Sequence, residues 1–303
     1  GYFVSGDLVV ECREKKWCPP GSRGTCAENR QDTGCALCAP GYAPTDAKDC
    51  NRCLTTDRVS TSLFALASTL APAALVVLLT HRTMKDVLSQ SAHSMSLALH
   101  INIGIMSIQL LTLYLRLDIK WVAPADEIKR LLNSLEDFDV IDPSCLVEQN
   151  IPLLAYASNI VLPMVIATGV ALITYVMRTL GRGEATRVIQ WNATGSVFFV
   201  FFLLIARLAM APFACREEPS GHHTLERYPS TLCWTEPHSG FILVGLVALG
   251  VIEVPFLAMC VVATWTHQAR ALEGDYAMVR RFHFLFSKWR FSRYYFGLVL
   301  LCR

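Results

Sequence analysis

The stretch from Ser60 to Thr80 constrains the fold of this chain more than any other feature. It runs for 21 residues without a formal charge, between Arg58 and Arg82. At a rise of about 1.5 Å per residue, a helix of this length covers roughly 30 Å, the thickness of the hydrocarbon core of a bilayer. A buried helix in a large soluble core is the alternative. Because comparable apolar stretches follow, we predict a membrane-spanning helix.

Further apolar runs repeat this pattern along the chain. The sequence is 53% hydrophobic and 17% charged, whereas soluble globular domains carry about 25% charged residues. We therefore expect an all-α polytopic membrane bundle over residues 58–303, with five complete helices and the start of a sixth. The sixth run is cut off by the end of the sequence, so we expect a fragment cut at both ends. The later spans are predicted at about 97–115, 151–177, 193–213, 241–265 and 294–303.

Residues 1–57 are predicted to form a small cysteine-rich module. Seven of the twelve cysteines lie there, in a stretch with little aliphatic core, which is typical of disulfide-stapled domains. Two Cys-x-x-Cys pairs would also suit a zinc ribbon, but we favour disulfides. An odd count leaves one thiol over, and Cys12 with a partner upstream is the simplest assignment. The other six, expected to pair in an order that the sequence does not reveal, are Cys18, Cys26, Cys35, Cys38, Cys50 and Cys53.

The charges of the loops predict the orientation of the bundle. Loops 81–96, 178–192 and 266–293 carry two, three and six Lys/Arg against one, one and two acids, so they are net +1, +2 and +4. Loop 116–150 has eight acids against four bases (−4), and loop 214–239 has four against two (−2). Basic loops remain on the cytoplasmic side. The module and ten of the twelve cysteines therefore fall on the extracellular or lumenal side, in a plasma membrane or another secretory-pathway membrane.

Three more cysteines lie in the outer loops. We favour a Cys215–Cys233 disulfide, with Cys145 as a competing partner. A histidine/cysteine metal site in the same loop lacks tight ligand spacing, so no metal is assigned. Asn192-Ala-Thr matches the glycosylation sequon, but the predicted orientation puts Asn192 at the cytoplasmic edge, and we reject it.

Several polar residues fall inside the predicted spans. His100, Asn102 and Gln109 lie in the second span, Arg207 in the fourth and Glu253 in the fifth, two residues before a proline that should open the backbone. Polar groups in lipid normally point into the bundle and are often functional. Interhelical hydrogen bonding, or an ion pair between Arg207 and Glu253, is one interpretation. A hydrated pathway for ions or protons is the other.

Motifs for enzymatic chemistry are missing from the sequence. We find no Walker loop, GxSxG, HExxH or dinucleotide fingerprint, so neither an enzyme nor a cofactor is expected. The basic segment 266–293 is predicted to contact anionic lipid rather than nucleic acid. An extracellular protein or small ligand for the module, and homo-oligomerisation, stay open.

The order of these features resembles a known family. Cys35-Ala-Leu-Cys38-Ala-Pro-Gly-Tyr42 is similar to ephrin-receptor-like and EGF/laminin-like repeats. The whole layout resembles a large group of protist and algal membrane proteins, in which such a repeat precedes a transient-receptor-potential-like (TRP-like) domain. The motifs in that domain, in chain order, are Asn102, Gln109-Leu110, Trp121, Asp142…Cys145, Cys215, Leu232-Cys233, His238, Phe282…Phe284-Leu285 and Arg293-Tyr294-Tyr295.

The resemblance implies a channel-like or sensory protein. We accordingly expect a cell-surface protein that conducts or gates cations, with the cysteine-rich module as a stalk or sensor. A non-conducting receptor or adhesion protein is the alternative. A transporter would be marked by paired inverted repeats, which the sequence does not show.

Overall fold

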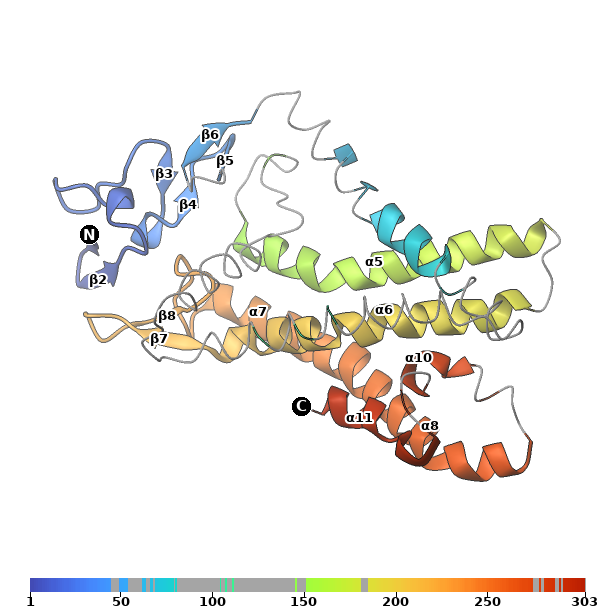
Figure 1. Cartoon of the computed structure of the whole chain (residues 1–303). Helices are drawn as coiled ribbons and strands as arrows, with labels where there is room; N and C mark the ends of the chain where they lie inside the picture. The colour runs from blue at the N-terminus through green and yellow to red at the C-terminus, as the bar shows by residue number, and fades with distance from the viewer. Residues whose placement is uncertain are drawn as a thin grey trace. The chain divides into compact units, whose positions relative to one another are not determined.

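The computed structural model is mostly helical, with a disulfide-rich N-terminal region (Figure 1). It divides into two compact units, residues 1–66, 140–161 and 205–251, and residues 67–139, 162–204 and 252–303. The residues that the structure describes are 1–44, 49–53, 62–63, 66–67, 69–78, 80, 104, 107, 111, 145, 151–180, 185–274, 278, 281–286, 289 and 291–302.

The N-terminal part of the first unit consists of short strands paired as three antiparallel ribbons. Strand β1 (Tyr2–Ser5) pairs with β2 (Leu8–Glu11) through a turn in which Gly6 has a φ of 58°, a value that glycine adopts readily. Strands β3 (Arg30–Gln31) and β4 (Leu37–Cys38) form the second ribbon, and β5 (Tyr42–Pro44) and β6 (Cys50–Arg52) the third. Two 3-10 turns, η1 (Lys15–Trp17) and η2 (Thr33–Cys35), connect them.

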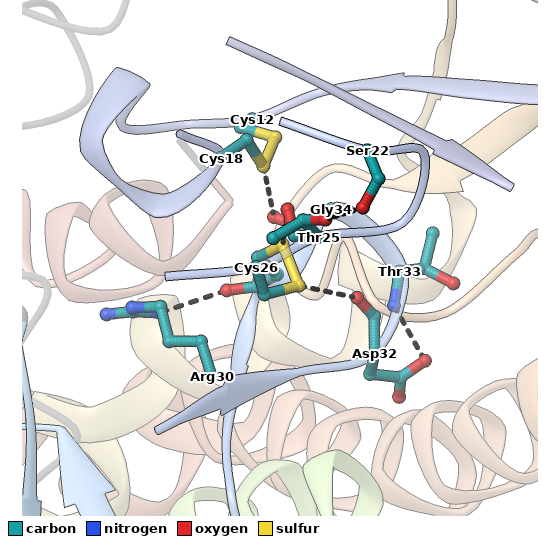
Figure 2. The surroundings of a disulfide bond; sticks show 10 residues. Cys12, Cys18, Ser22, Thr25, Cys26, Arg30, Asp32, Thr33 and Gly34 are labelled. Carbon is teal, nitrogen blue, oxygen red and sulfur yellow. Dashed lines mark hydrogen bonds between the residues drawn. A yellow bond between two sulfur atoms is a disulfide. The ribbon is translucent and has the colours of Figure 1, made fainter. Parts of the chain in front are cut away.

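Disulfides replace an aliphatic core in this region. Cys12–Cys18, Cys26–Cys35 and Cys38–Cys50 are bonded. The first two pack with Phe3 and Trp17, and Figure 2 shows the hydrogen bonds around them. Around them, Asp32 accepts a hydrogen bond from the backbone N–H of Thr33 at 2.7 Å, and Arg30 donates to the Cys35 carbonyl at 3.0 Å. Because the cysteines of both Cys-x-x-Cys pairs are in disulfides, no thiolate is left for a zinc ribbon.

The assignment of Cys12 as the unpaired cysteine is wrong. Cys12 bonds Cys18, and Cys53 is the cysteine whose partner lies outside the module, at Cys145. The reason is spatial: Cys53 and Cys145 are 92 residues apart in sequence, yet their Cα atoms lie 5.6 Å apart. This bond ties the N-terminal module to the loop predicted to follow the second span.

A second contact joins the module to the segment that follows residue 213. Strands β7 (Cys215–Glu217) and β8 (His223–Leu225) form a hairpin closed by the Cys215–Cys233 disulfide, the pairing that the sequence favoured. Glu218 is 6% exposed, and its carboxylate accepts hydrogen bonds from the Glu11 backbone N–H at 2.9 Å and from the Thr224 hydroxyl at 2.6 Å. The Arg216 guanidinium pairs with the Glu11 carboxylate at 2.8 Å. The module and the hairpin are therefore packed together by polar contacts.

Three helices are long and apolar enough to cross a membrane, within the residues that the structure describes. They comprise residues 152–179, 187–213 and 236–272, and only 28–39% of their apolar windows is buried within the protein. The first is α5 (Pro152–Thr179) and the second is α6 (Ala185–Met210) with η3 (Ala211–Phe213). The third joins α7 (Glu236–Ala248), the π-helix η4 (Leu249–Glu253) and α8 (Val254–Leu272).

These three helices correspond to the predicted spans 151–177, 193–213 and 241–265, whereas five complete spans and a sixth are more than the structure establishes. Of the predicted first span, the structure describes the apolar helix Thr69–Leu78, and residues 62, 63, 66, 67 and 80 are also helical. The predicted second span, 97–115, lies outside the described residues except at 104, 107 and 111. At the C-terminal end, η5 (Phe291–Arg293) and α11 (Phe296–Leu301) are too short to cross a membrane.

Small residues allow helices of the second unit to approach closely. A Cβ atom added to Gly169 of α5 would lie 3.2 Å from the Cβ of Ala73, which is fully buried in helix Thr69–Leu78. The buried face of α5 in this unit continues through Ile166, Val170 and Thr174 at helical spacing. Thr174 satisfies its hydroxyl by donating to the Val170 carbonyl at 2.8 Å.

Gly245 occupies an equally close approach in the first unit. An added Cβ there would lie 2.6 Å from the backbone carbonyl oxygen of Ala209 and 3.1 Å from the hydroxyl of Tyr156, which itself donates to the Leu208 carbonyl at 3.0 Å. A backbone carbonyl cannot rotate away as the end of a side chain can. We expect Gly245→Ala to lower the free energy of unfolding by about 1–3 kcal/mol, measured by thermal unfolding in detergent.

Gly250 provides the matched control for this prediction. It lies on the same long helix, and an added Cβ would meet nothing within 4 Å. Gly250→Ala should leave the unfolding midpoint unchanged or raise it slightly, because alanine stabilises helices relative to glycine. An equal loss of stability in both variants would show that the substitution acts through the geometry of the helix, and not through the close approach of the Ala209 carbonyl.

Candidate functional site

The most unusual feature of the apolar helices is the break at Glu253. Residues Leu249–Glu253 form a π-helix between α7 and α8. Pro255, two residues further on, has no backbone N–H, so the hydrogen-bond ladder of an α-helix cannot continue through it. π-Turns inside longer helices occur frequently at functional sites. The sequence-based expectation that Pro255 opens the backbone here agrees with this geometry.

The break turns Glu253 inward. Its side chain is 5% exposed, whereas Val251 is 69% and Val254 is 59% exposed. Neither carboxylate oxygen has a hydrogen-bond partner among the described residues. A buried ionised carboxylate without a partner is strongly unfavourable, so such a group is either carried protonated or pairs with a cation. The sequence suggested an ion pair between Arg207 and Glu253. Among the described residues, the carboxylate of Glu253 accepts no hydrogen bond that would form such a pair.

Glu253 begins a buried stripe that continues along α8. Phe256, Cys260, Thr264 and His267 follow at intervals of three or four residues, and all are buried. The three ionisable members, Glu253, Cys260 and His267, are seven residues apart, or about 10 Å per step along the helix. Because seven residues are close to two turns, they share one face of the helix. The stripe therefore places a carboxyl, a thiol and an imidazole in line.

The lower members of the stripe have defined surroundings. The Thr264 hydroxyl donates to the Cys260 carbonyl at 2.8 Å, so it is satisfied within the helix. The His267 ring stacks on Phe286 with a centroid distance of 4.1 Å and lies 4.8 Å from the ring of Tyr294. Aromatic faces hold the imidazole at a fixed place next to the C-terminal segment.

An aromatic cluster packs against the same face of α8. Its buried members come from the four helices α6, α8, α10 (His283–Phe286) and α11, and they are Phe199, Phe202, Phe256, Cys260, Ala263, Phe284, Leu285, Phe286 and Leu301. Phe284 lies in the short helix α10, directly on Gly195, where an added Cβ would clash with its ring. The cluster buries Phe256 and Cys260, which lie in the middle of the stripe.

Asn192 fixes this cluster to α6. It is 2% exposed, accepts from the Phe284 backbone N–H at 3.1 Å and donates to the Val188 carbonyl at 3.0 Å. A buried amide with both ends engaged is not accessible to a glycosylating enzyme. This packing provides an independent reason to reject the sequon at Asn192.

The sequence-predicted polar residues are only partly described. His100, Asn102 and Gln109 lie outside the described residues, Arg207 is half-buried in α6, and Glu253 is buried at the π-turn. Cys260 and His267, which share the face of Glu253, were missed by sequence reasoning, although the seven-residue spacing from Glu253 is visible in the sequence.

The cysteine and histidine cluster of the outer loop is not a metal site. Cys215, Cys233 and His238 lie within 4.8 Å of one another, but the two sulfurs form a disulfide. Nδ1 of His238 accepts a hydrogen bond from the Trp234 backbone N–H at 3.0 Å. Nε2 of the same ring lies 2.8 Å from the Pro212 carbonyl oxygen. Because Nδ1 is the acceptor, Nε2 carries the proton and donates to this carbonyl. No ligand atom of the trio is available to a cation.

Comparisons with known proteins do not place the chain in a family. No family model, no curated protein and no solved structure matches it. The functional argument therefore depends on the geometry of the chain itself, above all on the π-turn and the stripe that begins there.

Proposed function

We propose that this chain is a polytopic membrane protein with its N-terminal module on the extracellular or lumenal side. The three long helices expose most of their apolar surface, which is favourable in lipid and unfavourable in water. The five disulfides lie in the N-terminal module and in the loops whose charge predicts an outer location. The Cys53–Cys145 bond requires the module and loop 116–150 to share one side of the membrane.

Within that class, we propose a TRP-like channel or sensor that conducts or gates cations. Five complete spans and the start of a sixth belong to this proposal, as does the layout that resembles the protist and algal family. The single observation that carries it is Glu253, a buried carboxyl without a hydrogen-bond partner at a π-turn in an apolar helix. Ionisable residues inside membrane spans mark ion or proton pathways by default.

Electrical recording from the full-length protein in a planar bilayer tests this proposal. We expect a cation current, and we expect Glu253→Gln to reduce it about tenfold or more, since the variant keeps the size of the side chain but cannot carry charge. Glu273→Gln is the matched control, because Glu273 is exposed at the end of α8. An absence of current under voltage, stretch and lipid stimuli would overturn the proposal.

A non-conducting receptor is the second candidate. The observation that favours it is the polar contact between the module and the β7–β8 hairpin, through Glu218 and Arg216, which would let a ligand on the module act on the helices. A saturable ligand of the purified protein, combined with the absence of current, would favour this candidate.

In either case we propose that segment 266–293 contacts anionic lipid, with Arg270 and Arg281 exposed there. We also propose that the protein can assemble as a homo-oligomer.

A further inference from the structure

A groove lies between the C-terminal half of α5 and the N-terminal half of α6, away from the stripe of Glu253. Its volume is about 380 Å³, and residues from both helices line it. Those that matter for its chemistry are Thr168, Leu172, Tyr175, Arg178, Arg187 and Gln190. The end of the groove that is lined by Thr168 and Leu172 is mostly apolar, and the end that is lined by the two arginines is cationic.

The charge of the groove is entirely positive among its described lining residues. Arg178 lies in the last turn of α5 and Arg187 in the first turn of α6, and both are exposed. No described carboxylate lines the groove. Arginine presents a planar fork of donors that matches phosphate oxygens, and the N-terminal end of α6 adds a partial positive charge. An anion with phosphate geometry is the ligand that this end of the groove fits.

The apolar part of the groove distinguishes a lipid from a soluble anion. Leu172 is 60% and Tyr175 is 63% exposed, on helices whose apolar surface faces outward. Tyrosine is enriched at the level of lipid headgroups. From Thr168 to Arg178 the groove follows ten residues of α5, or roughly 15 Å. A molecule with a phosphate at one end and an aliphatic chain at the other would cover both parts.

We propose that this groove binds one anionic phospholipid, with its phosphate between Arg178 and Arg187 and an acyl chain along Leu172 and Thr168. Basic pockets between membrane helices on the cytoplasmic side are known to hold anionic headgroups. A zwitterionic lipid fits less well, because its headgroup cation would lie next to two guanidinium groups. The inference rests on the membrane insertion proposed above, and it assigns a site distinct from segment 266–293.

Native mass spectrometry of the full chain tests this site. The protein is reconstituted in nanodiscs of equal parts phosphatidylcholine and phosphatidylglycerol, and the lipid retained after release is identified. We expect one retained phosphatidylglycerol, preferred about twenty- to thirtyfold, since each basic residue near anionic headgroups contributes roughly fivefold. The double variant Arg178→Gln/Arg187→Gln should lose this preference.

Two further variants separate the site from general attraction of anionic lipid. Arg23→Gln/Arg52→Gln removes the same number of charges from exposed positions outside both the groove and segment 266–293, and it should keep the preference. Gln190→Glu keeps both arginines but adds a carboxylate beside them, and it should abolish the preference. Equal losses in the two arginine pairs, or an unchanged preference in the groove variants, would overturn the proposal.

Two measurements identify the cause of a negative result. Glycerol phosphate in excess should not displace the lipid, because it lacks the acyl chain; displacement would show that the groove is a site for soluble anions. Extraction of membranes with alkaline carbonate tests insertion separately. A chain that stays in the membrane but shows no lipid preference refutes the groove alone, whereas a chain that is released refutes the membrane protein as well.

Discussion

Glu253→Met should make the protein more stable and at the same time abolish the proposed cation current. In the folded protein the carboxyl is buried without a hydrogen-bond partner among the described residues. An unsatisfied buried polar group costs about 1–3 kcal/mol, and methionine fills a similar volume without that cost. We expect the midpoint of thermal unfolding in detergent to rise by roughly 2–10 °C.

The opposite signs of the two effects are what make this experiment informative. A residue kept for packing would lower stability when it is replaced, whereas a residue kept for function may be replaced with a gain in stability and a loss of activity. Glu273→Met is the control, because Glu273 is exposed. This substitution should change the free energy of unfolding by less than about 0.5 kcal/mol. A lower midpoint for Glu253→Met would mean that the carboxyl is paired in the folded protein.

The sequence predicted the existence of the long helices better than their ends. Apolar runs with at most one charge identified the spans 151–177, 193–213 and 241–265, since a bilayer requires about 20 apolar residues. The helices extend further: α6 starts at Ala185, and the third helix runs from Glu236 to Leu272. Backbone hydrogen bonds continue past the last apolar residue, so a charge in the sequence marks the membrane edge and not the helix end.

The pairing of cysteines that are far apart in the chain could not be predicted from the sequence, for a physical reason. A bond needs Cβ atoms within a few ångströms, and that closeness depends on the whole fold when the partners are far apart in the chain. The local pair Cys215–Cys233, 18 residues apart, could be proposed from one loop. Cys53–Cys145 could not, because the predicted first and second spans lie between its two cysteines.

The candidate site was predicted in part. Glu253 was evident as a charge in an apolar run, and Pro255 indicated the break in the helix. Cys260 and His267 were overlooked because neither is formally charged at neutral pH and each was judged without its neighbours. Taken at a spacing of seven, the three residues predict one face of a helix.

Removal of the Cys53–Cys145 disulfide should weaken the protein more than removal of any other disulfide. This bond closes a loop of 92 residues, whereas Cys215–Cys233 closes one of 18. By the chain-entropy model, the longer loop corresponds to about 4.6 kcal/mol and the shorter one to about 3.2 kcal/mol. Helices that stay inserted after unfolding reduce both values, but the order should persist. The double variants Cys53→Ser/Cys145→Ser and Cys215→Ser/Cys233→Ser, compared by thermal unfolding, measure the difference.

The same bond tests the orientation on which the functional proposals depend. Digestion without reductant should release one cross-linked species that contains the peptides of Cys53 and Cys145, and reductant should separate them. A membrane-impermeant maleimide added to intact cells should label neither cysteine before reduction and both after it. Labelling without reduction would contradict an oxidised module. Labelling that needs both reduction and an opened plasma membrane would exclude the cell surface and leave a lumenal module. Because the bond joins the module to loop 116–150, one such result fixes the side of both segments. The chain between Cys53 and Cys145 must then cross the membrane an even number of times, as the predicted first and second spans do together.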